Sequence, residues 1–198
     1  MVVLISGGGS NLEALADACE RGDVPGQIVG VLADRDCLGL KIAERRGIPC
    51  EVLVPADHGS REEWSDALRE ATEGLEPDLV VSAGFMRILS PVYVDAFRDR
   101  LLNLHPSLLP AFPGAHAVRD ALAAGVRVTG TTVHFVDHEV DHGPIVLQEA
   151  VRIEPADDES ALHDRIKTVE HRLLAEACRL FLEGRVALEG GRVRIHYG

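Results

Sequence analysis

Residues 2–12 read Val-Val-Leu-Ile-Ser-Gly-Gly-Gly-Ser-Asn-Leu, and they carry the strongest indication of the fold class. A short apolar run that ends in consecutive glycines is typical of a buried strand that turns into a helix. The following residues predict a helix over 11–21, because Leu12, Leu15 and Cys19 recur on one face and Gly22 follows the last turn. The stretch therefore predicts a strand, a glycine loop and a helix at the start of an α/β fold.

The same alternation continues along the rest of the chain. Apolar runs predict further strands at 28–33, 51–54, 79–82, 101–105, 131–136 and 145–153. Helical spacing predicts helices at 38–46, 61–72, 92–97, 117–124 and 159–183, with a small hairpin over 186–195. Such alternation predicts an α/β, Rossmann-like single domain, with a mostly parallel twisted sheet covered by helices on both faces.

The composition of the 198 residues limits which binding partners and which cellular compartment we expect for the protein. The chain is 46% hydrophobic and 26% charged, as ordinary globular proteins are, and its net charge of −12 argues against nucleic acid as a partner. It has no apolar run of about 18 residues, so we expect no membrane span. A strand-like run at the very start and four scattered cysteines predict no signal peptide and a reduced, cytoplasmic setting.

The glycine loop at residues 6–11 is a candidate anion site. Glycine lets backbone amides approach a phosphate, and a helix N-terminus favours negative charge. We expect Ser10 or Asn11 to cap the helix or to bind the anion. The loop lacks the Gly-Lys-Ser/Thr of a P-loop, and Leu12 stands where a dinucleotide fingerprint needs its third glycine. Asp34, after the second strand, keeps dinucleotide binding open, and a tight turn with a helix cap is the plainest alternative.

Residues 103–110, Asn-Leu-His-Pro-Ser-Leu-Leu-Pro, carry the candidate chemistry. Residues two apart on a strand point to the same side, so Asn103 and His105 should present an amide and an imidazole to one spot. Pro106 biases His105 toward an extended backbone. In parallel sheets ligands bind outside the carboxyl ends of strands, which is where this segment ends.

A second polar loop lies at residues 137–144 and reads Asp-His-Glu-Val-Asp-His-Gly-Pro. Its carboxylates, Asp137 and Asp141, fit turn chemistry, but they also fit pairing with a histidine. A carboxylate near His105 would favour the imidazolium form of that ring.

Three histidines, His134, His138 and His142, recur every four residues, a spacing that would bring metal ligands together on a helix. The segment around His134 is β-branched and aromatic, however, and therefore strand-like. Residues four apart on a strand lie about 13 Å apart, too far to share a metal. We expect no metal site and solvated or turn-bonded histidines.

The chain resembles the phosphoribosylglycinamide formyltransferases, folate-dependent enzymes of purine synthesis, over nearly its whole length. The segments that carry the resemblance are 5–12, 83–90, 103–113 and 130–141. The set Asn-x-His with a distant Asp is shared by a wider group of formyl-folate enzymes, whereas its combination with the Gly-Ser-Asn loop is more specific. The resemblance implies one formyltransferase domain over residues 1–198, with 10-formyltetrahydrofolate as co-substrate and glycinamide ribonucleotide as acceptor. The small-molecule substrates would be bound by a monomer or a homodimer.

The resemblance also implies a role for each matching residue. The catalytic group would be Asn103, His105 and Asp141. The ribonucleotide would be held by Gly9, Ser10, Asn11, Lys167 and Glu170. The folate would be held by Arg61, Met86, Arg87, Ile88, Leu89, Asn103, Asp137, His138, Glu139, Val140 and Asp141. Without the resemblance, Lys167 and Glu170 would be an ordinary solvated helix pair. His142 stands where a small residue is common, and we expect it beside Asp141.

Two other functions stay open at this point. A formyltetrahydrofolate deformylase would release formate from the same folate, but such enzymes usually carry an additional N-terminal domain and a second histidine where Pro106 stands. A non-catalytic nucleotide-binding module would use the glycine loop and Asp34. A serine hydrolase is disfavoured, because no Gly-x-Ser-x-Gly elbow surrounds Ser10 or Ser107.

Overall fold

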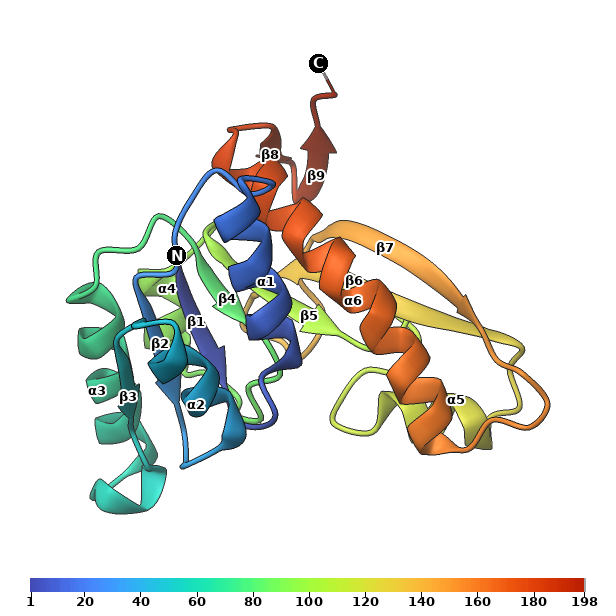
Figure 1. The fold of residues 1–198 in the computed structure, drawn as a ribbon, viewed down its shortest axis with the longest axis horizontal. Coiled ribbons are helices and arrows are strands. Elements are labelled where there is room, and N and C mark those ends of the chain that lie inside the picture. Colours follow the sequence, from blue (N-terminus) through green and yellow to red (C-terminus); the bar gives the residue numbers. More distant parts are fainter. Residues whose placement is uncertain (198) are drawn as a thin grey trace.

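The computed structural model describes residues 1–197, and its strands and helices alternate as expected (Figure 1). The strands are β1 (Val2–Ile5), β2 (Gly30–Ala33), β3 (Cys50–Val52), β4 (Val80–Ser82), β5 (Leu101–His105), β6 (Val128–Phe135), β7 (Ile145–Arg152), β8 (Val186–Glu189) and β9 (Arg192–Ile195). The helices are α1 (Ser10–Arg21), α2 (Leu38–Arg45), α3 (Arg61–Glu73), α4 (Pro91–Ala96), α5 (Ala117–Ala123) and α6 (Glu159–Leu182), with a 3-10 turn η1 at Pro55–Asp57. The largest shift from expectation at a strand start is in β6, which begins at Val128 instead of Thr131.

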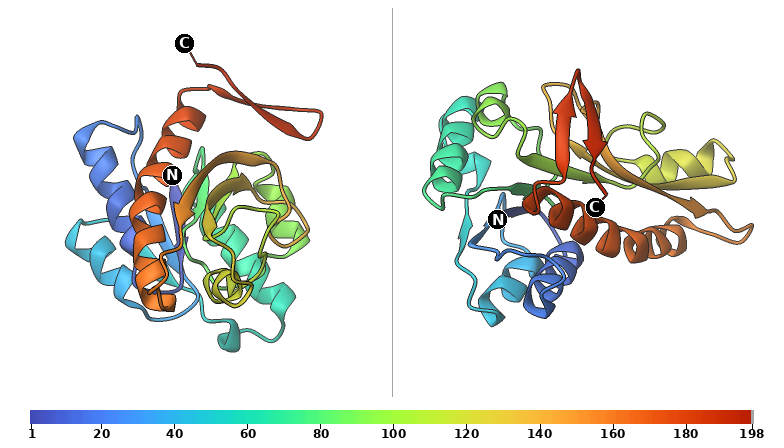
Figure 2. Two further views of the ribbon diagram at one scale, coloured as in Figure 1. Left: turned by 90° about the vertical axis from the view of Figure 1, so that its right-hand side faces the viewer. Right: turned by 90° about the horizontal axis from the view of Figure 1, so that it is seen from above.

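The main sheet has seven strands in the order β3-β2-β1-β4-β5-β6-β7. Strands β1 to β5 pair in parallel, whereas β6 pairs antiparallel with β5 and β7 antiparallel with β6. The prediction of a mostly parallel sheet is confirmed. The hairpin β8–β9 forms a separate sheet and projects from the end of α6 (Figure 2).

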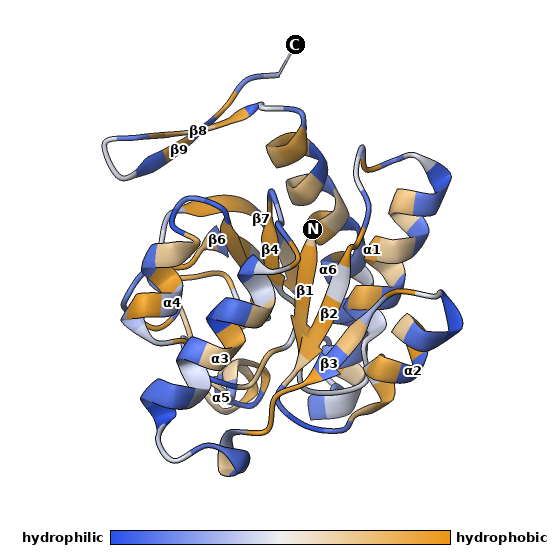
Figure 3. Ribbon diagram, turned by 90° about the vertical axis from the view of Figure 1, so that its left-hand side faces the viewer, coloured by the Kyte–Doolittle hydropathy of each residue, from blue (hydrophilic) through white to orange (hydrophobic). Residues whose placement is uncertain are grey.

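Helices cover both faces of this sheet, as predicted, because the strands alternate in the faces to which their apolar residues point. In β1, Val3 and Ile5 pack into one core with residues of α1, α2 and α6. The intervening Val2 and Leu4 pack into another core with residues of α3 and α4. The apolar strands therefore lie between two helical layers whose polar sides face outward (Figure 3).

The chain order creates a switch point at β1. The chain leaves β1 toward β2 and β3, and then returns to the other side of β1 for β4 and β5. The helices that follow β1 and β4 therefore lie on opposite faces, which opens a crevice at the carboxyl ends of β1 and β4. The glycine loop and residues 84–89 leave the sheet at this place, as the sequence predicted.

Candidate active site

Strand β5 supplies the predicted amide and imidazole. Its apolar residues, Leu102 and Leu104, face the core that contains α6, so Asn103 and His105 point to the other side of the sheet. Both of these polar residues line one cavity there. The expectation that Asn103 and His105 face the same place is confirmed by this geometry.

Asp141 lies at the centre of the site. Its Oδ2 is 3.3 Å from His105 Nδ1 and accepts a 2.7 Å hydrogen bond from the Gly114 amide. Its Oδ1 accepts a longer hydrogen bond, 3.4 Å, from Asn103 Nδ2. Asp141 has a φ of 54°, a left-handed conformation that Asp and Asn tolerate better than most residues. The carboxylate thus holds the amide and the imidazole in one arrangement.

Asp141 does not reach the site from a carboxyl edge of the parallel strands. Strand β6 runs antiparallel to β5, so its last residue, Phe135, pairs with Leu102 and not with His105. The loop at residues 137–144 therefore starts beside the first residues of β5, and its Asp141 contacts the side of the sheet that carries Asn103.

His105 has acceptors at both ring nitrogens. Its Nε2 is 2.8 Å from the Phe112 carbonyl oxygen, and its Nδ1 faces the Asp141 carboxylate. Both partners are hydrogen-bond acceptors. The ring is buried, at 5% exposed, and its orientation is fixed from two sides.

His134 is a site residue that the sequence analysis missed. It is buried, and it pairs across the β5–β6 ladder with Asn103. Its Nδ1 donates to the Phe135 carbonyl at 2.8 Å, which leaves Nε2 to accept the 3.1 Å hydrogen bond from Asn103 Nδ2. Burial lowers the pKa of His134, which favours the neutral ring that this pattern needs. The prediction of a solvated or turn-bonded histidine is wrong for this residue.

The other two histidines of the series do behave as expected. His138 contacts Asp95, and His142 contacts Asp137 at 2.8 Å; both histidine side chains are about half exposed or more. His142 was expected beside Asp141, but it turns to Asp137, whose hydrogen bond raises the pKa of His142.

The cavity on β5 has a volume of about 370 Å³ and collects nearly all residues predicted to hold the folate. Those that line it are Met86, Arg87, Ile88, Leu89, Asn103, Asp137, His138, Glu139, Val140 and Asp141. Arg61 is not among the lining residues, but it donates a 3.1 Å hydrogen bond to the Ile88 carbonyl at the edge of the cavity.

The glycine loop is shaped by a close approach of two backbones. Gly9 has a φ of 79°, and a Cβ at this position would lie 2.5 Å from the Gly39 Cα. Gly9 is also the N-cap of α1, and no side chain caps this helix. The prediction that Ser10 or Asn11 caps it is therefore wrong, because a left-handed glycine already takes the cap position. Gly7 and Gly8 are exposed.

Glu170 and Lys167 approach this loop from α6. Glu170 is 4% exposed and its Oε2 accepts a 3.0 Å hydrogen bond from Asn11 Nδ2. Burial raises the pKa of Glu170, although Asn11 and Lys167 oppose this shift. Lys167 contacts Asp164 and remains half-exposed. The interpretation of Lys167 and Glu170 as a solvated helix pair is therefore wrong for Glu170, which is buried and contacts Asn11 of the glycine loop.

Asp34 does not point toward a ligand. Its side chain is fully buried, with Oδ2 at 2.7 Å from Arg35 and 2.6 Å from Arg87. Burial alone would raise the pKa of Asp34, but hydrogen bonds from Arg35, Ser6 and Arg87 outweigh it and hold the pKa at about 2. Because its carboxylate is already occupied by these partners, the idea that Asp34 holds a nucleotide ribose is not supported.

This buried carboxylate predicts a pH-dependent stability. Asp34→Asn should lower the free energy of unfolding at pH 7 by about 2 kcal/mol, since the pKa of an unfolded aspartic acid is about 3.9. The folded pKa is the lower one, so the stabilisation is complete above about pH 4 and disappears as the pH falls toward about 2. Urea unfolding of the wild type and Asp34→Asn between about pH 7 and pH 2 measures this difference in the free energy of unfolding. If the difference in the free energy of unfolding stayed constant between pH 7 and pH 3, the lowered pKa of Asp34 would be contradicted.

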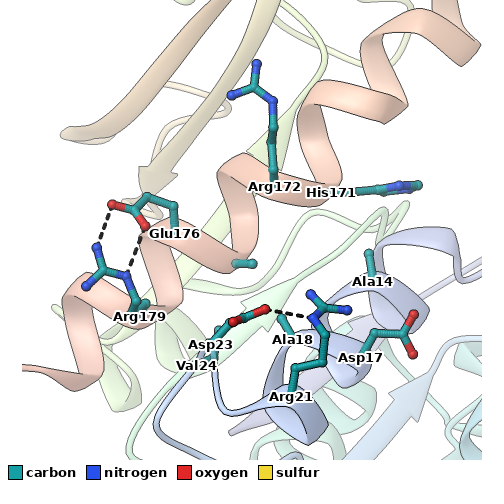
Figure 4. Close-up of a pocket in the computed structure, with 11 residues that line it drawn as sticks. Ala14, Asp17, Ala18, Arg21, Asp23, Val24, His171, Arg172, Glu176 and Arg179 are labelled. Atoms are coloured by element: carbon teal, nitrogen blue, oxygen red, sulfur yellow. Dashed lines mark hydrogen bonds and ion pairs between the residues drawn. The ribbon is translucent and has the colours of Figure 1, made fainter.

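A second cavity, of about 480 Å³, lies between α1 and α6 (Figure 4). Four of its charged side chains pair with one another, Arg21 with Asp23 and Arg179 with Glu176, each pair at 2.8 Å. None of the predicted site residues lines it. The smaller cavity on β5 is therefore the better candidate for chemistry.

Residues 1–197 contain neither a cluster of metal ligands nor a membrane-spanning helix. Within this range, no group of three His, Cys, Asp or Glu side chains is placed to hold a metal ion. No helix in the same range is long and apolar enough to cross a bilayer.

Comparison with known proteins agrees with this site. The formyl transferase family matches residues 1–178. The chain is 50% identical to a phosphoribosylglycinamide formyltransferase of Mycobacterium tuberculosis, over 98% of this chain and 93% of that protein. It superposes on a glycinamide ribonucleotide transformylase 1 from Symbiobacterium toebii with a TM-score of 0.97 and 48% identity, covering 99% and 93% of the two chains. A formyltetrahydrofolate deformylase from Pseudomonas syringae has a TM-score of 0.91 but 27% identity, and the match spans 65% of that chain.

The family match, over residues 1–178, spans the glycine loop, Asn103, His105 and Asp141. The identity to individual relatives extends this match over nearly the whole sequence. The chain therefore belongs to the formyl transferase family.

Proposed function

We propose that the protein transfers the formyl group of 10-formyltetrahydrofolate to the amine of glycinamide ribonucleotide, a step of purine synthesis. The observation that carries this proposal is the joint contact of Asp141 with Asn103 and His105 at the wall of the cavity. The near full-length similarity to phosphoribosylglycinamide formyltransferases supports it.

The two substrates would enter from different sides of this group. The ribonucleotide phosphate would lie on the amides of Gly9, Ser10 and Asn11, at the N-terminus of α1. Glu170 and Lys167 would face its ribose and phosphate from α6. The folate would fill the cavity on β5, whose lining residues were given above.

The first step is attack of the substrate amine on the formyl carbon. An amine of the α-amino type has a pKa of about 7.7–8.0, so a useful neutral fraction exists near pH 7 without a strong base. A C–N bond forms, and the carbonyl oxygen becomes a tetrahedral oxyanion. Asn103 Nδ2 is placed to donate a hydrogen bond to that oxygen.

The second step breaks the bond between the formyl carbon and the folate nitrogen. We expect the departing folate nitrogen to replace the Phe112 carbonyl at His105 Nε2, which donates a hydrogen bond or a proton to it while Asp141 holds the ring at Nδ1. The amine gives up one proton and the folate nitrogen gains one, with water in the site as the relay. Tetrahydrofolate and the formylated ribonucleotide leave with no net change in protons.

Two alternatives are less well supported. A deformylase would need to place water where the amine lies, and Pro106 stands where such enzymes usually carry a second histidine. The deformylase relative is also the more distant one, at 27% identity. A nucleotide-binding module without chemistry would leave the contact between His105 and Asp141 without a role, and its ribose ligand, Asp34, is engaged elsewhere.

The deciding experiment mixes the purified protein with 10-formyltetrahydrofolate, with and without glycinamide ribonucleotide, and follows folate absorbance. Folate consumption that requires the ribonucleotide supports the transferase. Formate release without it would instead establish a deformylase. No reaction under either condition would contradict both.

We expect this transfer to need no added metal, because the amine is a sufficient nucleophile at neutral pH. The test is the rate after exhaustive chelation, compared with the rate after addition of zinc. Loss of activity on chelation that zinc restores would overturn this expectation.

Glu170→Gln tests the ribonucleotide site. We expect its KM for glycinamide ribonucleotide to rise about tenfold, because a neutral amide replaces a buried carboxylate that accepts hydrogen bonds. The KM for the folate should stay nearly constant. Glu176→Gln, on the same helix but in the cavity of Figure 4, is the matched control. If both variants had the same KM for glycinamide ribonucleotide, Glu170 would not belong to the substrate site.

Nothing in the proposed reaction requires a macromolecular partner. The net charge of −12 fits small-molecule substrates better than nucleic acid. The four cysteines are all unpaired, which fits a reducing compartment, and we propose the cytoplasm. A monomer or a homodimer would each serve this mechanism.

A further inference from the structure

Residues 84–89, here called the cavity loop, are fastened to the protein at several points. The Met86 amide donates a 2.8 Å hydrogen bond to Ser6 Oγ. The Arg87 Nε donates a 2.6 Å hydrogen bond to Asp34 Oδ2. Both contacts bridge long stretches of chain, and both attach the loop to the carboxyl ends of β1 and β2.

Burial anchors only the two ends of the cavity loop, where Phe85 is 8% exposed and stacks on Trp64 and Leu89 packs against the same core. Met86 and Ile88 are each 62% exposed, although both line the cavity. The loop also has no helix or strand of its own. The conformation of the exposed middle of the loop, residues 86–88, therefore depends on polar contacts, which are those of Met86 and Arg87 and the hydrogen bond from Arg61 to the Ile88 carbonyl.

The fastening residues do not themselves reach the cavity. Neither Ser6 nor Asp34 is among the residues that line it. The Asp34 side chain is fully buried beneath Arg87 and Arg35, and it also accepts a hydrogen bond from the Ser6 hydroxyl. Ser6 and Asp34 thus form one buried pair that contacts the loop through Met86 and Arg87.

We propose that Asp34 and Ser6 are positioning residues for the folate, which hold the cavity loop in the conformation that binds it. The assignment of folate to this cavity rests on the proposed function. A loop that is already ordered loses less conformational entropy when the ligand binds. When only a fraction of molecules has the competent loop, the apparent affinity falls by that fraction.

Arg35 supplies a matched control. Its Nε and Nη2 donate to the same Asp34 carboxylate, at 3.1 and 2.7 Å, but Arg35 does not belong to the cavity loop. Arg35→Ala removes an ion pair from Asp34 and leaves Arg87 and Met86 fastened. Asp34→Ala releases Arg87 and also removes the partner of the Ser6 hydroxyl.

The first test is hydrogen–deuterium exchange of the cavity loop, which does not depend on any substrate. We expect the amides of residues 84–89 to exchange about tenfold faster in Asp34→Ala than in Arg35→Ala or the wild type. Ser6→Ala, which removes the acceptor of the Met86 amide, should behave like Asp34→Ala and serves if that variant does not fold. Unchanged exchange in these variants would overturn the proposal.

The second test compares the effect of each variant on the KM for 10-formyltetrahydrofolate with its effect on kcat. Asp34→Ala should raise the KM for 10-formyltetrahydrofolate about tenfold, the effect of losing one charge-assisted hydrogen bond, while kcat changes much less. Asp34→Asn keeps one acceptor oxygen, so its KM for the folate should lie between those of Asp34→Ala and the wild type. When Arg87 is already replaced by alanine, Asp34→Ala should raise the folate KM little further, because the two residues act through the same hydrogen bond.

These outcomes separate the two proposals. A wild-type protein that does not transfer the formyl group refutes the proposed function, whatever the exchange data show. A wild-type protein that does transfer it, with equal folate KM values in Asp34→Ala and Arg35→Ala, refutes the positioning role alone.

Discussion

Replacing Asp141 with asparagine should lower kcat by about 10³–10⁴ while the protein stays folded, as in other catalytic groups in which a carboxylate orients a histidine. The carboxylate accepts the Gly114 amide on one oxygen, which also faces His105. Its second oxygen accepts from Asn103. An asparagine has one acceptor oxygen and one NH₂ group. Whichever way it is turned, the NH₂ group meets a donor, either the Gly114 amide or the Asn103 amide.

Asparagine is the right substitution for this test because it keeps the size of the side chain. It also tolerates the φ of 54° at this position. Steady-state kinetics under saturating substrates measures kcat, and circular dichroism with thermal unfolding reports the fold. Asp23→Asn, on an exposed ion pair near α1, is the isosteric control and should keep wild-type turnover. If Asp141→Asn kept more than about a tenth of wild-type kcat, the orienting role would fail, because that is far above the residual activity expected of a broken triad.

The part of the site that could be predicted from sequence is the part that depends on local geometry. Asn103 and His105 lie two residues apart on a strand, so their common direction follows from the period of the strand alone. The glycine loop and the cavity loop follow apolar strands, and the rule for parallel sheets places both at the carboxyl edge. The helices follow from the spacing of their apolar residues.

The contacts that were missed depend on pairing between distant strands. His134 lies opposite Asn103 only because β6 pairs antiparallel with β5 in one register. A shift of one residue would turn His134 to the other face. The sequence pattern reveals the strand but not this register, so His134 was interpreted as a solvated histidine.

Long-range pairing also explains the errors at Asp34 and at the helix cap. The position of Asp34 after the second strand is compatible with a ribose ligand, but Arg87 from a distant loop occupies its carboxylate. The cap of α1 depends on the approach of Gly39 to Gly9, two residues on separate elements. A local motif cannot reveal either contact, because in each case the partner is set by the assembled sheet.

Replacing Asn103 with alanine should lower kcat by about 10²–10³, the usual effect of removing one donor to an oxyanion. One hydrogen of Asn103 Nδ2 is held by His134 Nε2 at 3.1 Å. The other makes a long contact, 3.4 Å, with Asp141. That second hydrogen is weakly engaged and is the one available to the oxyanion. Both KM values should change only a few-fold, since the interaction strengthens in the transition state.

The comparison that makes this prediction sharp is Asn103→Asp, which has nearly the same shape. Its carboxylate would lie beside Asp141 and opposite the neutral His134, with no hydrogen to offer the oxyanion and a negative charge that repels it. We therefore expect Asn103→Asp to lose at least as much turnover as Asn103→Ala, although it keeps more of the side chain. If Asn103 were needed only to fill space, the order would reverse and the aspartate would be the more active enzyme. Parallel kcat measurements on the two variants, with unfolding curves as the control for stability, decide between donation and packing.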